Sequence, residues 1–283
     1  MKKSKALFVI VLIYLLAFSV GVAACFAFSA PILRFFIFDL AATVVTFVFS
    51  VLLHNSSVYD PYWSFTPMVM SVWLFAESGA WGVWQILFIL VFNVWGYRQT
   101  ANWVTVFTDF SYEDWRYRKY RAENGPFMWF IINLCGIHLV PTLVVFAGML
   151  PLFEMAQNPL GPLSLPGMAL VLCGVALEFF ADRDMHAFLA EAKGERRVCR
   201  RGLWSYSRHP NYLGEIIVWL GTFLAMLPYA PEKWYFGIGF VSVAVLFNVV
   251  SIPLMEKRQL SRRPDYADYQ KTTSRLLLWP HKK

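Results

Sequence analysis

The sequence predicts an all-α fold, a polytopic transmembrane bundle of about eight helices with both termini in the cytoplasm. Three observations lead to this fold class. Charged residues make up only 15% of the 283-residue chain and apolar residues 58%, whereas a soluble domain carries about 25% charged residues. Long apolar runs recur along the chain. The basic residues gather between alternate runs, as they do in proteins that cross a membrane.

Each apolar run is a candidate membrane span because a helix needs about 20 apolar residues to cross a bilayer. The candidates are residues 6–28, 32–54, 64–79, 83–106, 127–150, 163–187, 211–228 and 234–255. The third and seventh runs are short, so we expect them to tilt or to enter the bilayer partway. Only helices and closed barrels satisfy the backbone in lipid, and these runs are too long and too continuously apolar for barrel strands.

The positions of lysine and arginine test the number of spans. With the N-terminus in the cytoplasm and eight alternating spans, all basic residues except Arg34 and Lys233 fall on the cytoplasmic side,. The net charge of +7 is then explained by topology and by contact with anionic lipid. No other feature of the sequence indicates nucleic-acid binding. We expect one membrane-embedded domain over 1–283, with a two-helix segment over 1–55 and a catalytic core over 56–283. The oligomeric state stays open.

Polar side chains concentrate in the segments expected on the cytoplasmic side. These segments are VYDPYWSFTP (58–67), WGYRQTANW (95–103) with EDWRY (113–117), EFFADRDMHAF (178–188) with the loop to RHPNYLGE (208–215), and the tail MEKRQLSRRPDYADYQ (255–270). Because all four meet at one side of the membrane, we expect a polar chamber that opens to the cytoplasm.

The sixth span carries an ionisable stripe. Glu178, Asp182 and His186 are spaced i, i+4 and i+8, so they share one helix face,. Such residues at membrane depth usually face a bundle interior or a wet cavity, although a polar cap at the membrane boundary would use the same residues. The histidines of the chain are scattered and the cysteines show no pairing or ligand spacing, so we expect no metal site.

The segment RHPNYLGE has the features of an anion site at a helix start. Pro210 favours the first helical position and Asn211 can cap, while helix N-termini bind anions through free N–H groups. Arg208 and His209 precede that end, and Glu215 follows one turn later, where it could accept hydrogen bonds from a ribose or amide group. The alternative is a basic anchor followed by a cap. No Gly-rich dinucleotide motif or P-loop occurs.

The stretch GLWSYSRHPNYLGEIIVWLG (202–221) resembles the C-terminal signature of the 3-oxo-5α-steroid 4-dehydrogenase superfamily, in particular its DUF1295 branch. The resemblance extends over most of the chain and includes YDPYWS, W-G-x-R, EDWRY, E-x-x-x-D and the tail Glu256 with P-x-Y-x-x-Y. Isoprenylcysteine and phospholipid methyltransferases, which use S-adenosylmethionine, carry a similar RHP-x-Y-x-G. Asn211, Glu215 and the YDPYWS segment favour the reductase.

The resemblance implies NADPH, a hydride transferred to the β-carbon of an enone, and an acidic group that polarises the carbonyl oxygen. Asp60 matches the catalytic glutamate of the steroid enzymes, which have a Gln-Glu pair there. A carboxylic acid can donate a hydrogen bond at pH 7 only if its surroundings raise its pKa. Trp95 stands where the steroid enzymes have a partner tyrosine, so Tyr59 or Tyr97 could substitute.

The resemblance also implies the cofactor positions. Asn211 and Glu215 would contact the nicotinamide or its ribose, Glu178 and Asp182 would line the same cavity, and Arg208 and His209 would meet the phosphates. The further positions implied are Arg98, Arg116, Arg201, Tyr206, Tyr212, Tyr266 and Tyr269.

The expected function is NADPH-dependent reduction of a carbon–carbon double bond in an apolar lipid or steroid-like substrate, which enters from the bilayer. The chain has short tails, so we expect a bacterial inner membrane. The alternatives are a methyltransferase that uses S-adenosylmethionine and a non-catalytic lipid-binding or transport protein.

Overall fold

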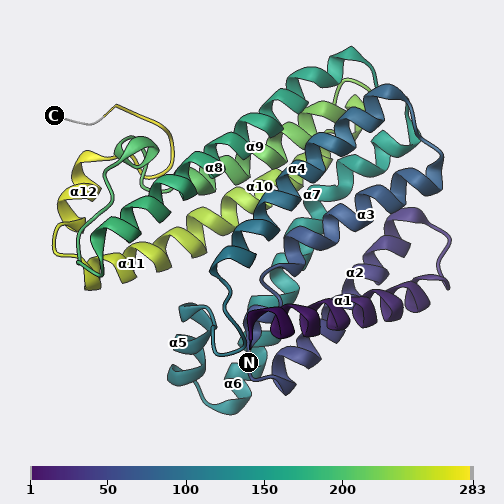
Figure 1. Ribbon diagram of the computed structural model, residues 1–283. Helices are drawn as coiled ribbons and strands as arrows, with labels where there is room; N and C mark the ends of the chain where they lie inside the picture. The colour runs from purple at the N-terminus through teal and green to yellow at the C-terminus, as the bar shows by residue number, and fades with distance from the viewer. Residues whose placement is uncertain (1, 281–283) are drawn as a thin grey trace. The chain divides into compact units, whose positions relative to one another are not determined.

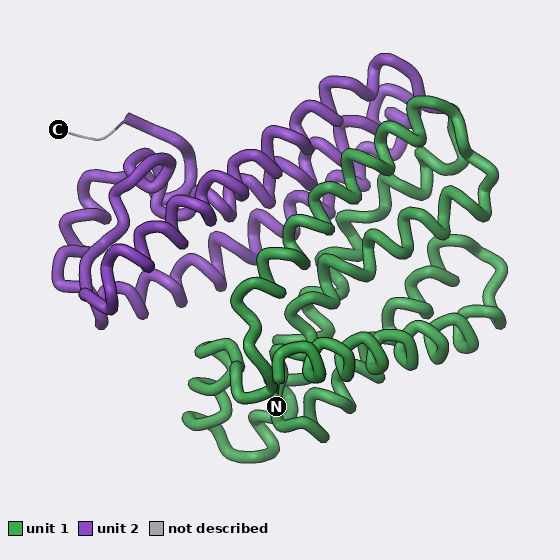
Figure 2. The backbone as a smooth tube through the Cα atoms, in the orientation of Figure 1, with its two compact units in different colours: residues 1–159 green, residues 160–283 purple. Residues whose placement is uncertain are grey.

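The computed structural model describes residues 2–280, and all regular structure in them is helical, which confirms the all-α prediction (Figure 1). Within these residues the β-type pairing is an isolated parallel bridge between Ser207 and Ser274. The chain divides into two compact units, residues 1–159 and residues 160–283 (Figure 2). The expected organisation as one domain with a two-helix N-terminal segment stays a prediction.

The first unit is a bundle of helices around an aromatic core. α1 packs on α2, and α3 contacts both α4 and α7. The core includes Tyr14, Tyr59 and Tyr62, each at most 6% exposed. The elements are α1 (Lys3–Cys25), α2 (Pro31–Leu52), η1 (Ser56–Val58), α3 (Tyr62–Ser78), α4 (Val83–Val106), α5 (Trp115–Glu123), α6 (Pro126–Ile131), the π-helical η2 (Ile132–Leu139) and α7 (Val140–Gln157).

The second unit is built on a pair of long helices, α8 and α9, with α10 packed on α9. Its elements are η3 (Pro162–Ser164), α8 (Leu165–Ala192), η4 (Gly202–Ser205), α9 (Pro210–Met226), η5 (Pro231–Gly237), α10 (Ile238–Leu246), the π-helical η6 (Phe247–Ser251), α11 (Ile252–Arg262) and α12 (Tyr266–Thr272). The elements η5, α10, η6 and α11 follow one another without a break.

Glycines bring α8 and α9 into close contact. A Cβ on Gly167 would lie 2.3 Å from the backbone nitrogen of Ala225, and one on Gly174 would lie 2.6 Å from the carbonyl oxygen of Gly214. Neither position therefore accepts a larger residue without a shift of backbone. Small residues at helix interfaces are the usual means of close helix packing in membranes, where water does not drive association. This contact fixes the position of the α8 carboxylates, along the helix axis, relative to the start of α9.

All eight predicted apolar segments are helical, and five helical stretches are long and apolar enough to cross a membrane. These are Lys3–Cys25, Pro31–Leu52, Pro126–Gln157, Pro162–Ala192 and Pro231–Arg262. α3 and α9 have 17 residues each, so each spans roughly 25 Å, short of a hydrocarbon core of about 30 Å. The count of eight spans and the cytoplasmic termini stay predictions.

Large apolar side chains cover the outer faces of the helices. More than half of the side-chain surface is exposed at Phe8, Leu15, Leu90, Phe127 and Val249. A soluble protein rarely exposes so many large apolar side chains, whereas lipid chains cover such side chains without cost. Together with the five spans, this surface identifies an integral membrane protein whose helices contact lipid.

Candidate functional site

Asp60 lies in the turn between η1 and α3, and a loop of the same unit holds that turn in place. Asn55 caps η1 by accepting a 2.9 Å hydrogen bond from the backbone nitrogen of Ser57. The Asn55 amide donates to two carbonyl oxygens in the loop 110–112. The hydroxyl oxygen of Ser57 accepts a 2.9 Å bond from the backbone nitrogen of Asp114. The turn that presents Asp60 is therefore fixed by polar contacts to a segment more than 50 residues away.

The EDWRY motif begins α5 and supplies a partner for Asp60. Asp114 caps α5 by accepting a 2.8 Å bond from the backbone nitrogen of Arg116, whose side chain also pairs with it at 2.8 Å. Buried Glu113 accepts a 2.8 Å bond from the first N–H of η1. With the helix start anchored in this way, the hydroxyl of Tyr117 donates a 2.7 Å hydrogen bond to Oδ1 of Asp60.

Burial raises the pKa of Asp60 from its ordinary value to about 7, and the negative charge of Asp114 adds to the rise. Hydrogen bonds from Ser57 and Tyr117 oppose the rise only in part. Burial also raises the pKa of Tyr117, so this phenol stays protonated. Although the Asp60 side chain keeps some solvent access, its neutral and ionised forms are both populated near pH 7. The neutral form has an O–H group that can donate a hydrogen bond, while the carboxyl group also takes hydrogen bonds from Tyr117 and Ser57.

The other three candidates for catalysis have different surroundings. Tyr59 is 1% exposed, and its hydroxyl lies 2.7 Å from the Thr142 hydroxyl on α7. Trp95 is fully buried, with its ring centroid 5.4 Å from that of Phe92. Tyr97 is 72% exposed. Tyr59 therefore belongs to the same turn as Asp60 but directs its hydroxyl into the core. Tyr97 lies on the outer surface of the unit.

The two basic candidates of the first unit have acceptors close by. The guanidinium of Arg98 donates a 2.7 Å hydrogen bond to the side chain of Gln99. Arg116 pairs with Asp114 at 2.8 Å. Their roles toward a cofactor stay predictions.

In the second unit, α9 begins where the sequence predicts, but its cap differs. Pro210 occupies the first helical position and His209 is the N-cap, with no side-chain capping bond. The prediction that Asn211 caps the helix is wrong, because the N-cap is His209, two residues earlier, and Asn211 lies inside the first turn. Pro210 explains the shift, since its ring already has the helical φ and its missing N–H costs nothing at that position.

Arg208 and His209 hold a carboxylate that belongs to the chain itself. Arg208 Nε donates to Oε1 of Glu256 at 2.7 Å, and His209 Nε2 lies 3.2 Å from the same oxygen. The Gln270 amide donates to the other carboxylate oxygen of Glu256 at 2.9 Å. Burial lowers the pKa of His209, so the imidazole is neutral at pH 7 and donates to Glu256 as a hydrogen-bond partner. The anion at this helix start is therefore the Glu256 carboxylate.

The C-terminal segment is fastened to the residues that precede α9. The backbone nitrogen of Arg208 donates to the carbonyl oxygen of Ser274 at 2.9 Å, and the Ser207 hydroxyl donates to that of Leu276 at 2.7 Å. The Tyr269 hydroxyl donates to the carbonyl oxygens of Trp204 and Ser207. Tyr266 and Tyr269 are at most 3% exposed. The structure thus gives these two tyrosines a packing role, and a cofactor role stays a prediction.

Two buried carboxylates lie at the interface of α8 and α9. Glu178 is 1% exposed, and its Cγ would lie 2.6 Å from a Cβ on Gly214. Glu215, the next residue along α9, is 4% exposed and accepts a 2.8 Å bond from the indole nitrogen of Trp219. Exposure then rises along the ionisable stripe of α8, from Glu178 through partly exposed Asp182 to exposed His186. The structure therefore brings Glu178 and the turn that carries Glu215 together.

The remaining candidates of the second unit divide between stacking and surface positions. The ring of Tyr212 stacks on that of His209 at 5.5 Å and on that of Phe247 at 4.5 Å. Arg201 pairs with Glu191 at 2.7 Å, with both side chains more than half exposed. Tyr206 is 48% exposed. Among residues 2–280, no three His, Cys, Asp or Glu side chains gather closely enough to hold a metal ion.

Sequence reasoning missed two partners. Tyr117 belongs to a motif that the sequence singles out, but nothing local links it to Asp60. Glu256 carries a clearer signal, because it is the one acidic residue in the basic stretch MEKRQLSRR. A lone carboxylate among so many cations is expected to take an ionic partner.

Comparison with protein families adds a finding that covers most of the chain. The model of a family described as "Protein of unknown function (DUF1295)" matches residues 46–273, a range that includes Asp60, Tyr117, Arg208 and Glu256. Searches of curated proteins and of solved structures find no match to the chain.

Proposed function

This chain belongs to the DUF1295 family of proteins of unknown function, and we propose that it is a membrane-embedded, NADPH-dependent reductase. Its substrate would be an apolar lipid or steroid-like molecule with a double bond conjugated to a carbonyl, and its location a bacterial inner membrane. One observation carries the proposal. Asp60 has a pKa raised to about 7 and accepts a 2.7 Å hydrogen bond from Tyr117.

Reduction of an enone adds a hydride at the β-carbon and a proton at the α-carbon, and negative charge develops on the carbonyl oxygen. A preorganised donor to that oxygen stabilises the transition state. Neutral Asp60 would be such a donor, since a protonated carboxyl group keeps an O–H while it accepts a hydrogen bond from Tyr117. Burial makes this form available at pH 7, whereas an ordinary aspartate would be ionised. Tyr117 acts as the positioning residue, because its hydroxyl fixes the orientation of the carboxyl group.

Bound NADPH would supply the hydride. The start of α9 supports this proposal, because Asn211 lies in its first turn and Glu178 packs against Gly214, the residue before Glu215. Carboxylates accept hydrogen bonds from ribose hydroxyls. The fit to the phosphates is poorer at this place, because Arg208 and His209 already hold Glu256.

The first test is thermal unfolding of the detergent-purified protein with NADPH, NADH or S-adenosylmethionine. A ligand at a hundredfold excess over its Kd stabilises the folded state by about 2.7 kcal/mol. We expect stabilisation by NADPH that is lost in Asn211→Ala and Glu215→Ala. Asn124→Ala, at a partly buried position after α5 in the other unit, serves as the control. Stabilisation by S-adenosylmethionine alone would favour the methyltransferase, and no response to any of the three would overturn the proposal.

The second test separates the roles of the acid. Loss of NADPH absorbance is followed in membranes supplied with apolar enones. Asp60→Ala removes the donor and should lower kcat by about 10² to 10³. Asp60→Asn keeps a donor, so it should retain more activity and lose the fall in rate above pH 7. Asp109→Asn, which changes an exposed loop carboxylate, is the control. An Asp60→Ala variant as active as the control would exclude Asp60 from the chemistry.

A further inference from the structure

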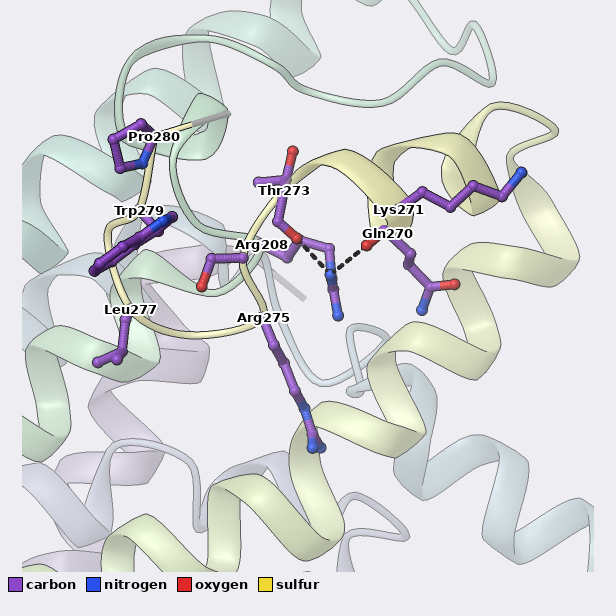
Figure 3. Close-up of a pocket in the computed structure, with 9 residues that line it drawn as sticks. Arg208, Gln270, Lys271, Thr273, Arg275, Leu277, Trp279 and Pro280 are labelled. Carbon is purple, nitrogen blue, oxygen red and sulfur yellow. Dashed lines mark hydrogen bonds between the residues drawn. The ribbon is translucent and has the colours of Figure 1, made fainter. Parts of the chain in front are cut away.

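The C-terminal segment 275–280 carries large apolar side chains that the protein itself does not cover. Leu277, Leu278 and Trp279 are 61%, 39% and 62% exposed. A cavity of about 430 Å³ separates this segment from Arg208, and Leu277 and Trp279 line it from the same side (Figure 3). Leu278 does not line the cavity. The segment therefore has uncovered apolar surface in more than one direction, and packing against a core does not account for its position.

Hydrogen bonds to the residues that precede α9 hold this segment in place. The Ser207 hydroxyl donates to the carbonyl oxygen of Leu276 at 2.7 Å. The backbone nitrogen of Trp279 donates to the carbonyl oxygen of Tyr206 at 3.3 Å. Because the two stretches of chain are joined in this way, the level of the residues before α9 relative to the membrane is also the level of the C-terminal segment.

The residues before α9 lie at the level where α8 becomes charged. The indole nitrogen of Trp204 donates a 2.8 Å hydrogen bond to the carbonyl oxygen of Ala181 on α8. Ala181 directly precedes the charged run 182–184, and the only charged residue of α8 before it is Glu178, which is buried. Since charged side chains are costly in hydrocarbon, the start of this run marks a membrane boundary. The C-terminal segment therefore lies close to that boundary.

A contact with the stretch Pro231–Arg262 indicates the same level. The Arg275 guanidinium donates a 2.6 Å hydrogen bond to the carbonyl oxygen of Asn248 on η6. Asn248 lies eight residues before Glu256, the first charged residue after the uncharged run 234–255, so it is about 12 Å inside the end of that run. Figure 3 shows the Arg275 and Lys271 side chains extended in opposite directions, and the Lys271 side chain is 75% exposed. The segment thus lies between a side chain directed toward the apolar layer and one in water.

We propose that the C-terminal segment is an interfacial anchor, which inserts Leu277, Leu278 and Trp279 into the bilayer surface at the level where α9 begins. Its partner is the boundary between the headgroups and the acyl chains of the surrounding membrane. Tryptophan is enriched at this boundary because its ring is apolar while its N–H is polar. The leucine side chains leave water for the acyl chains, which is favourable. The anchor does not depend on the proposed reductase activity.

The test uses a fluorophore on Leu278→Cys in the full chain, with the four native cysteines replaced by alanine, in phosphatidylcholine nanodiscs. A lipid with a nitroxide near its headgroup should quench this fluorophore strongly, and aqueous iodide should quench it weakly. Asp268→Cys is the control, because the Asp268 side chain on α12 is 72% exposed and lies outside the segment. There we expect the reverse order of the two quenchers. Equal access of iodide to both positions, or no quenching by the nitroxide lipid at Leu278→Cys, would overturn the proposal.

A second substitution in the Leu278→Cys chain tests the tryptophan itself. Trp279→Ser should cause a loss of quenching by the nitroxide lipid and a gain of quenching by iodide, because the segment then has less apolar surface to insert. Trp234→Ser is the matched control, since Trp234 on η5 is a 70% exposed tryptophan outside the segment, and it should change neither. Both substitutions alter exposed side chains, so the fold should be retained. The same result for the two substitutions would show that Trp279 does not hold the segment in the bilayer.

Discussion

The guanidinium of Arg208 meets the carboxylate of Glu256 at 2.7 Å, across 48 residues of chain. The side chains are 10% and 14% exposed, so water screens the pair weakly. Two further bonds from Arg208 reach the carbonyl oxygens of Gln270 and Thr273. One side chain thereby connects the start of α9, α11 and the C-terminal segment.

Removal of the Glu256 carboxylate should destabilise the second unit. Glu256→Ala leaves the Arg208 charge and His209 buried without their acceptor, and loss of one partner from a buried pair costs about 3 to 5 kcal/mol. We expect a lower unfolding temperature in detergent and earlier proteolytic cleavage after residue 262. The exposed Glu232→Ala is the control, and equal stability of the two variants would contradict this role.

The raised pKa of Asp60 should appear in the pH dependence of stability. Since the folded-state pKa of about 7 exceeds the ordinary value of 3.8, the folded state binds more protons between these values. Stability is therefore lost as pH rises from about 4 to about 7. Asp60→Asn cannot ionise, so it should become more stable than the native protein above pH 7, by roughly 2 kcal/mol after allowance for partial exposure. Unfolding measured at pH 5 and pH 8 checks this, and an identical difference at both values would refute it.

The close contact of α8 and α9 should not tolerate a methyl group. Gly167→Ala would place a Cβ 2.3 Å from the backbone of Ala225, and relief of such overpacking costs typically about 1 to 3 kcal/mol. Gly136→Ala, on η2, meets its nearest atom at 4.0 Å and should be neutral or slightly stabilising. Thermal unfolding of both variants makes the comparison. Equal stability would show that the helices can separate at little cost.

The predicted topology can be tested with single cysteines in a variant whose four native cysteines are replaced by alanine. With eight spans, Ser111→Cys lies in the cytoplasm and Gln157→Cys on the opposite side. Both positions are exposed in the structure. A membrane-impermeant thiol reagent added to intact cells should label only Gln157→Cys. Labelling of both or of Ser111→Cys alone would require a different number of spans.

The sequence by itself determined that this chain is a helical membrane protein and where its apolar helices lie. The predicted run 83–106 coincides with α4, and Pro210 marked the start of α9. Apolar length, proline and charge asymmetry act locally or relative to the membrane, so each can be read from a short stretch of chain. The same logic located the polar segments from which the candidate site is built.

Only the tertiary structure decided which polar residues are partners. Tyr117 bonds to Asp60 across 57 residues, and Glu256 takes the place at Arg208 and His209 that the sequence predicted for a phosphate. The cavity between Arg208 and the C-terminal segment could not be predicted from the sequence, because its lining combines residues about 60 positions apart. Such pairings depend on how distant segments pack, and the energy of a buried polar group is set by neighbours that local sequence does not specify.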